Sequence, residues 1–185
     1  MSLDSGILDV AERLFAAHGY AGVGVDAIGA AAGCNASAIY RCFSGKRALL
    51  AALSDRANDE IQARLGPARE DPVDELGHLI DVHASFAREC PNLAVVVAHE
   101  GAELSREDRQ IFEGRYRGYL DRWDAVLADR YPDCRGDSLV TARDGVHWLL
   151  ASPAVSRVRS PRPKADTILR AMALAALAAL TSPGA

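Results

Sequence analysis

The stretch from residue 28 to residue 46, IGAAAGCNASAIYRCFSGK, constrains the fold of this chain more than any other. It predicts a helix end, a sharp turn at Gly33 and a second helix over 36–42, because glycine permits a positive φ and Asn35 is a good N-cap. The second helix begins with small residues and has cationic neighbours, as does a helix that enters a DNA major groove in a helix-turn-helix. An ordinary turn between two helices of a bundle fits the same pattern.

The charge distribution favours a localised contact with nucleic acid. The 185 residues carry a formal net charge of −4, which argues against general affinity for DNA or RNA. Residues 27–54 contain no Asp or Glu, however, and they include Arg41, Lys46 and Arg47. A locally basic segment in an acidic protein suits a binder of one DNA site.

The sequence also predicts the compartment. Its first residues lack the pattern of a signal peptide, and its longest apolar run, 171–180, is far shorter than the roughly 20 residues that span a bilayer. We therefore expect a cytoplasmic protein with no membrane partner. The four cysteines have no CxxC spacing and are expected to be small apolar residues of a reduced protein. A redox role stays open for Cys34 and Cys42, which flank the 36–42 helix.

Apolar residues recur at helical spacing along the chain and predict an all-α fold of about nine helices. Gly-Pro and Cys-Pro pairs mark breaks between the helices, and residues 152–163, which contain three prolines, are expected to form a loop. The expected helices span 3–18, 25–32, 36–42, 45–65, 71–89, 93–102, 105–131, 137–151 and 164–181.

Residues 7–53 resemble the N-terminal domain of TetR-type transcriptional regulators. The resemblance covers about a quarter of the chain, and its residues agree in both type and spacing: Ile7-Leu8, Ala11, Leu14-Phe15, Gly19-Tyr20, Ile28, Ala32-Gly33, Ile39-Tyr40, Phe43, Lys46 and Leu49-Leu50. It implies a three-helix DNA-binding domain over 1–56 and a helical ligand-binding and dimerisation domain over 57–185.

The resemblance implies DNA contacts from the 36–42 helix and its flanks. Ala36, Ser37 and Arg41 fall where the family contacts bases, and Tyr40 and Lys46 fall where it contacts phosphates. We expect Arg41 to bind guanine through paired hydrogen bonds to O6 and N7. Asn35, at the head of the same helix, completes the predicted DNA-binding set. Solvated surface roles for Arg41 and Lys46 and a packing role for Tyr40 are the alternatives.

The last two predicted helices, 137–151 and 164–181, carry wide apolar stripes, and the many alanines of the last one allow close helix approach. By resemblance, they pair with the same helices of a second copy. Such a homodimer would bind a palindromic operator with two recognition helices. Packing of both helices within one chain is the alternative.

The middle of the chain holds aromatic residues mixed with a few polar ones, which is how sites for small ligands are built. The expected ligand is a small, largely apolar effector, although each aromatic residue could instead belong only to the core. Arginines 157, 159 and 162 could meet an anionic ligand such as an acyl-coenzyme A. The candidate ligand-binding residues are His83, Phe86, Glu100, Tyr116, Tyr119, Trp123 and Trp148.

These features predict a ligand-responsive transcriptional regulator, a repressor that the effector releases from DNA, with no cofactor or metal and no enzymatic activity. Activation instead of repression is left open. The HEGAE segment lacks the second histidine of a zinc-binding HExxH helix, and GxSxG is absent. One alternative is a TetR-like ligand-binding dimer without operator binding, because Val23 and Gly24 stand where the family commonly has Ser or Thr. A helical metalloenzyme is the other alternative.

Overall fold

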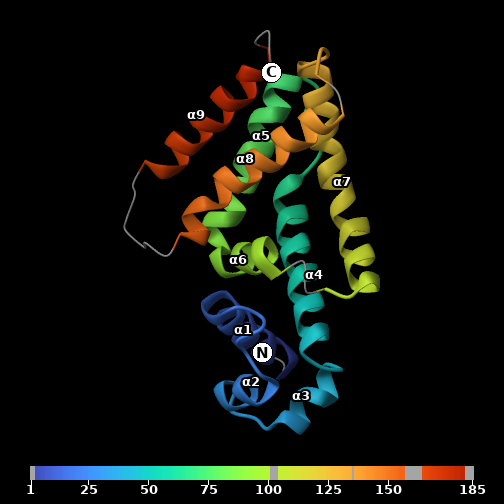
Figure 1. The fold of residues 1–185 in the computed structure, drawn as a ribbon, viewed down its shortest axis with the longest axis vertical. Coiled ribbons are helices and arrows are strands. Elements are labelled where there is room, and N and C mark those ends of the chain that lie inside the picture. Colours follow the sequence, from blue (N-terminus) through green and yellow to red (C-terminus); the bar gives the residue numbers. More distant parts are fainter. Residues whose placement is uncertain (1–2, 101–103, 135, 157–163, 182–185) are drawn as a thin grey trace. The chain divides into compact units, whose positions relative to one another are not determined.

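The structure is a computed structural model that describes residues 3–100, 104–134, 136–156 and 164–181, apart from a few side chains within them (Figure 1). The described residues form helices, turns and short connectors without a strand, which confirms the predicted all-α fold. The helices are α1 Leu3–His18, α2 Val25–Ala31, α3 Ala36–Cys42, α4 Lys46–Leu65, α5 Pro72–Glu89, α6 Pro91–Glu100, α7 Arg106–Arg130, α8 Asp137–Val155, α9 Ala165–Ala178 and the 3-10 helix η2 Ala179–Thr181.

Several predicted helix ends differ from the structure by one residue, and two, the start of α6 and the end of α8, differ by two or more. The helix expected to start at residue 93 begins at Pro91, because the first turn of a helix does not need the N–H that proline lacks. The loop expected from residue 152 is helical as far as Val155, since Pro153 lies in the last turn and the Ser156 N–H still reaches the Ser152 carbonyl at 2.9 Å. Residues 157–163, with their three arginines, lie outside the described part of the chain.

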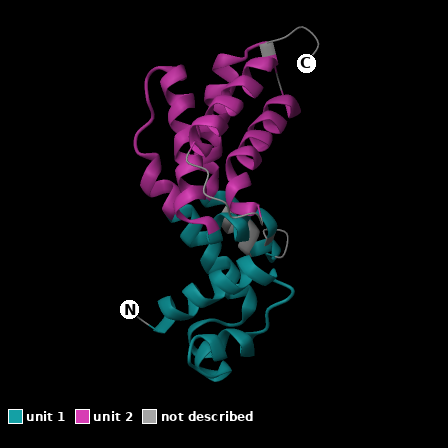
Figure 2. Ribbon diagram, turned by 90° about the vertical axis from the view of Figure 1, so that its left-hand side faces the viewer, with its two compact units in different colours: residues 1–59, 92–115 teal, residues 60–91, 116–185 magenta. Residues whose placement is uncertain are grey.

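The chain divides into two compact units, one of residues 1–59 and 92–115 and the other of residues 60–91 and 116–185 (Figure 2). Both units are discontinuous in sequence, whereas the predicted domains, 1–56 and 57–185, are continuous. The predicted domain boundary therefore stays a prediction.

The first unit contains α1, α2 and α3 around a small apolar core. Ile7, Phe15, Ile28 and Ile39 are almost fully buried there. The turn between α2 and α3 is tight: Gly33 has a φ of 69°, and a Cβ at Gly29 would lie 3.0 Å from the Cys34 carbonyl oxygen. Gly33 therefore permits the sharp turn, and Gly29 permits the close approach of α2 to the residues that precede α3.

The second unit is built on α5, α7, α8 and α9. The apolar residues Leu76, Leu79 and Ile80 of α5 are buried. Trp123 and Leu127 of α7 and Leu150 of α8 are also buried. Arg122 of α7 donates from Nε to the buried Glu75 carboxylate on α5 at 2.7 Å. α9 packs within the unit through Ala173 and Leu177, which are 0% and 1% exposed.

Candidate DNA interface and effector site

α3 is capped and anchored so that one of its faces is presented to solvent. The Asn35 Oδ1 accepts a hydrogen bond from the Ala38 backbone N–H at 2.9 Å, as predicted for an N-cap. Ala38 and Ile39 bury the inner face. The predicted DNA-binding residues Ser37, Tyr40 and Arg41 are exposed, with Tyr40 57% exposed.

The other predicted DNA-binding residues are either less exposed to solvent or already engaged in bonds within the protein. Ala36 is half-buried, and Asn35 is exposed although its side chain serves the cap. Lys46 is half-buried at the start of α4, where its Nζ donates to the Tyr20 carbonyl oxygen at 2.6 Å and lies 4.0 Å from the centre of the Tyr20 ring. Lys46 therefore ties the start of α4 to the connector after α1. An ammonium has three donors, so a phosphate contact stays compatible with this position.

Cys42, at the end of α3, lies beside Asp4 of α1. A hydrogen bond to the Asp4 carboxylate is the main cause that raises the pKa of the Cys42 thiol, and a small loss of hydration adds to it. A raised thiol pKa leaves less of the reactive thiolate at neutral pH. This contact disfavours a redox role for Cys42.

Four of the predicted ligand-binding residues come together in the second unit. His83 of α5 contacts Tyr119 of α7, whose ring also meets those of Tyr116 and Trp123 on the same helix. His147 of α8 completes the group, and we call these five residues the aromatic cluster. The His83 Nδ1 and the Tyr119 hydroxyl are 3.0 Å apart. The His83 and His147 rings stack with centroids 4.3 Å apart, and the Trp123 ring meets the His147 ring edge-on at 4.9 Å.

The aromatic cluster carries no charge at neutral pH. Burial lowers the pKa of His83 to about 4 and the pKa of His147 well below its ordinary value. Burial also raises the pKa values of Tyr116 and Tyr119. The buried Arg143, which lies nearby on α8, is paired with Asp124 at 2.6 Å and with the neighbouring Asp144 at 3.0 Å.

Two buried polar atoms of the aromatic cluster have no hydrogen-bond partner among the described residues: the Trp123 Nε1 and the His147 Nε2. The Trp123 N–H lies close enough to the Tyr119 oxygen to oppose slightly the rise in the tyrosine pKa, yet it lacks the geometry of a hydrogen bond. A buried unpaired polar group costs about 1–3 kcal/mol, and a native structure normally pairs it with a protein group, a water or a ligand.

The remaining predicted ligand-binding residues are less informative. Phe86 is buried on α5, and Trp148, which follows His147 on α8, is 50% exposed. The side chain of Glu100 lies outside the described part of the structure. His147 is not among the candidate ligand-binding residues, whereas its neighbour Trp148 is. The sequence alone does not show which of these two neighbouring helical residues faces the core.

Neither a metal site nor a membrane span emerges from the described residues. They contain no group of three or more His, Cys, Asp or Glu side chains placed to hold a metal ion. None of their helices combines the length and the apolar character that crossing a bilayer requires.

A capped helix with one face exposed to solvent, joined by a tight turn to the helix before it, is typical of a helix-turn-helix motif. Residues 7–53 match the family model of bacterial regulatory proteins of the tetR family, which confirms the resemblance over the same residues. No curated protein matches the chain.

Several solved structures share this fold over nearly the whole chain, and two of the three that follow are named as TetR-family proteins. A regulator from Rhodococcus RHA1 aligns with a TM-score of 0.81 at 18% identity, over 99% of this chain and 99% of its own. PfmR from Thermus thermophilus has a TM-score of 0.74 at 22% identity, over 93% and 97%. AibR, solved in complex with isovaleryl coenzyme A and operator DNA, has a TM-score of 0.77 at 20% identity, over 93% and 96%.

Proposed function

We propose that this protein is a homodimeric transcriptional repressor that binds a palindromic operator through α3 and leaves it when a small effector binds the second unit. The observation that carries the proposal is the exposed face of α3, with Ser37, Tyr40 and Arg41 held outward by a capped N-terminus and a buried inner face. The proposal is supported by AibR, which has the same fold and was solved with both operator DNA and a small ligand.

The aromatic cluster is our candidate for the effector site. A ligand oxygen placed beside Trp123 and His147 would accept a hydrogen bond from the indole N–H and pair with the imidazole Nε2, the two atoms that otherwise lack partners among the described residues. Because burial keeps both histidines neutral, the site favours an uncharged, largely apolar molecule with one oxygen acceptor. An ordered water in the same position is the alternative.

The switch would use α4, which starts at Lys46 shortly after α3 and contributes residues to both units. An effector that binds one arrangement of α4 better than the other shifts the population toward it, by as much as its two affinities differ. Release from DNA follows if the favoured arrangement sets the two recognition helices at a spacing that does not match the operator.

The test is an electrophoretic mobility shift with DNA that flanks the protein's own gene. We expect the parent protein to bind one site, and Arg41→Ala to lose discrimination between guanine and other bases at one position, an effect of about 1–3 kcal/mol. Arg130→Ala, an exposed arginine at the end of α7, is the matched control and should bind as the parent does. Equal binding by all three proteins would refute the role of Arg41, and no binding to any operator fragment would favour a ligand-binding protein without an operator.

A further inference from the structure

A groove of about 590 Å³ opens in the second unit between the end of α4, the outer side of α5 and the first turns of α9. This volume is in the range of pockets that hold small molecules. The groove is distinct from the aromatic cluster, since none of the five cluster residues lines it. The lining residues are Arg64, His78, Asp81, Val82, Ala84, Ser85, Arg88, Glu89, Asp166, Thr167 and Arg170.

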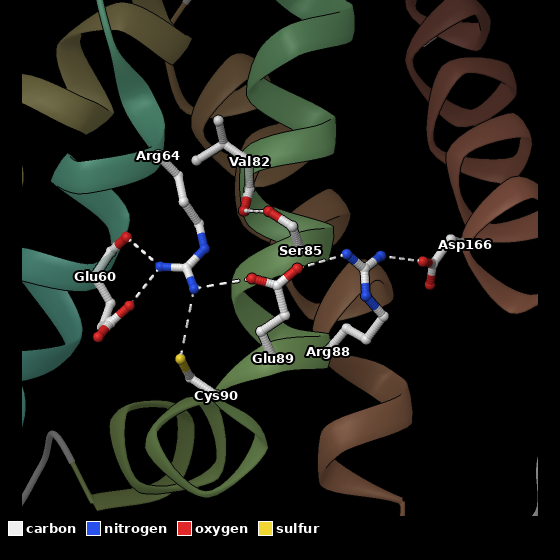
Figure 3. Close-up of polar contacts among 8 residues, drawn as sticks. All are labelled: Glu60, Arg64, Val82, Ser85, Arg88, Glu89, Cys90 and Asp166. Atoms are coloured by element: carbon white, nitrogen blue, oxygen red, sulfur yellow. Dashed lines mark hydrogen bonds and ion pairs between the residues drawn. The ribbon is translucent and has the colours of Figure 1, made fainter.

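A chain of ion pairs crosses the groove from α4 to α9 (Figure 3). Arg64 donates to Glu60 at 2.6 Å and to Glu89 at 3.0 Å. Arg88 donates to Glu89 at 2.7 Å and also pairs with Asp166 at the start of α9. The hydrogen bond from Arg88, and after it the one from Arg64, lowers the pKa of Glu89. The Glu89 carboxylate therefore stays charged in these ion pairs at neutral pH. The carboxylates therefore hold two guanidinium groups in fixed positions along the groove.

A third guanidinium, that of Arg170, has donors to spare. Its Nε donates to Asp81 at 2.9 Å, and this is its only ion pair among the described residues. A Cβ at Gly77 would lie 2.8 Å from the Arg170 Nη2, so the glycine lets the guanidinium lie close to the backbone of α5. Within the described part of the chain, no hydrogen bond of the two terminal nitrogens is found, so they can donate to a ligand in the groove.

The first turn of α9 adds further donors at the same end of the groove. The residue before α9, Lys164, makes no side-chain cap, and the Thr167 side chain lines the groove. The N-terminal N–H groups of a helix favour an anion. The lining holds three arginines and three carboxylates, so its formal charge is balanced, and a bound anion must compete with the resident carboxylates.

We propose that the groove binds a small phosphorylated organic molecule, with its phosphoryl group between Arg88, Arg170 and the first turn of α9. A phosphoryl group fits better than a carboxylate because it carries up to two charges and three acceptor oxygens, which can bond donors from several directions. The groove is larger than a phosphate needs, so the rest of the ligand is organic. This site goes beyond the proposed function, and neither operator binding nor the aromatic cluster is required for it.

A second copy of the chain need not cover this site. Asp166 and Arg170 share a helical stripe of α9 with Ala173, which packs inside the unit, because residues spaced by three or four lie on one face. The exposed apolar residues Ile168 and Met172 lie off that stripe. The face of α9 that a partner could use is therefore different from the face that lines the groove.

The test is titration of the full chain with phenyl phosphate, followed by calorimetry and by the NMR signals of the arginine Nε–H groups. Benzyl alcohol at the same concentration reports on apolar contact alone, and sodium chloride at matched ionic strength reports on screening. We expect saturable binding of phenyl phosphate and shifts of the Arg88 and Arg170 signals, with neither control reproducing them. Because no DNA is present, the result is independent of whether the protein is a repressor.

The variants locate the bound group. Arg170→Gln should weaken phenyl phosphate binding at least tenfold, Arg170→Lys should restore part of it, and Thr167→Val should weaken it less than Arg170→Gln does. Arg115→Gln is the matched control, since Arg115 also has one ion pair, to Asp55 at 2.9 Å, and similar exposure, but lies in the other unit. Absence of saturable binding, or equal effects of Arg170→Gln and Arg115→Gln, would overturn the proposal.

Discussion

At the scale of single residues, Asn35 links local folding to the proposed DNA contact. Its side chain satisfies a backbone N–H of a helix only seven residues long, and α3 has few other means of stabilisation at that end. Short helices are unstable alone, so the cap and the buried Ala38 and Ile39 together hold α3 in place. The same residue cannot point freely into a DNA groove while it caps the helix.

Asn35→Ala is expected to lower the free energy of unfolding by about 1 kcal/mol, because it leaves a helix donor unpaired. Asn35→Asp and Asn35→Ser, which can also cap, should retain most of that stability. Urea denaturation followed by circular dichroism measures all three. If the alanine variant proved as stable as the serine variant, the capping role would be ruled out.

The two histidines of the aromatic cluster predict how stability depends on pH. The unfolded chain takes up a proton at each histidine near pH 6.5, whereas folded His83 has a pKa of about 4 and His147 is also lowered. Between these values the unfolded state binds more protons, so the free energy of unfolding falls as the pH falls from about 6.5 to 4. The loss from His83 alone is on the order of 3 kcal/mol when complete.

Urea denaturation at several pH values between 7 and 4 checks this dependence. Carboxylates also titrate in the lower part of the range, so the informative quantity is the difference between variants. His83→Gln should remove part of the slope between pH 6.5 and 5, whereas His18→Gln, at an exposed position of α1, should leave it unchanged. Identical slopes in both variants would contradict a buried, neutral His83.

At the scale of elements, the conformation of the connector between α1 and α2 depends on a close contact between Gly22 and the backbone of α1. A Cβ at Gly22 would lie 2.5 Å from the His18 carbonyl oxygen, closer than real Cβ atoms come. Lys46 binds the same connector through Tyr20. The position of α2 therefore depends on a glycine that lets the chain turn tightly after α1, together with the cation at the start of α4.

Gly22→Ala should destabilise the first unit by about 1–3 kcal/mol, because the connector must shift to accept a Cβ. Gly24→Ala is a control in the same connector: a Cβ there meets nothing within 4 Å, and its φ of −95° suits any residue. We expect it to stay within about 0.5 kcal/mol of the parent. Thermal unfolding with and without operator DNA compares the two, and equal losses would show that the clash at Gly22 is unimportant.

The sequence predicted the helices better than it predicted the contacts between them. α1 and α3 begin and end where the sequence predicted, because apolar spacing, Asn35 and Gly19 act over a few residues. The aromatic cluster could be predicted only in part: His147 and Trp148 are neighbours, and about 100° of helix rotation separates them, so only tertiary packing decides that the histidine joins the cluster. The bond from Lys46 to the Tyr20 carbonyl was equally hidden, because a backbone oxygen leaves no mark in a sequence.

At the scale of the whole molecule, the proposed operator binding needs two copies of α3. α8 and α9 expose large apolar side chains that their own unit does not cover: Val140 is 41% exposed, Trp148 50%, Ile168 54% and Met172 50%. Exposed apolar residues on neighbouring helices are typical of protein interfaces. They support the predicted homodimer through 137–151 and 164–181, with the outer residues of α9 rather than the buried Ala173 and Leu177 facing the partner.

Charge placed on this surface should separate the copies without unfolding either. The double variant Ile168→Asp, Met172→Asp introduces two carboxylates that dimerisation would have to desolvate. In sedimentation velocity at micromolar concentration, we therefore expect a monomer for the double variant and a dimer for the parent. Val73→Asp, at a 55% exposed position of α5, adds a charge of the same kind elsewhere and should stay dimeric. The monomeric variant should also lose affinity for a two-half-site operator much more than for a single half-site, because only the former gains from two linked recognition helices. A monomeric parent, or dissociation by Val73→Asp to the same extent, would remove α9 from the interface and with it the two-fold operator complex.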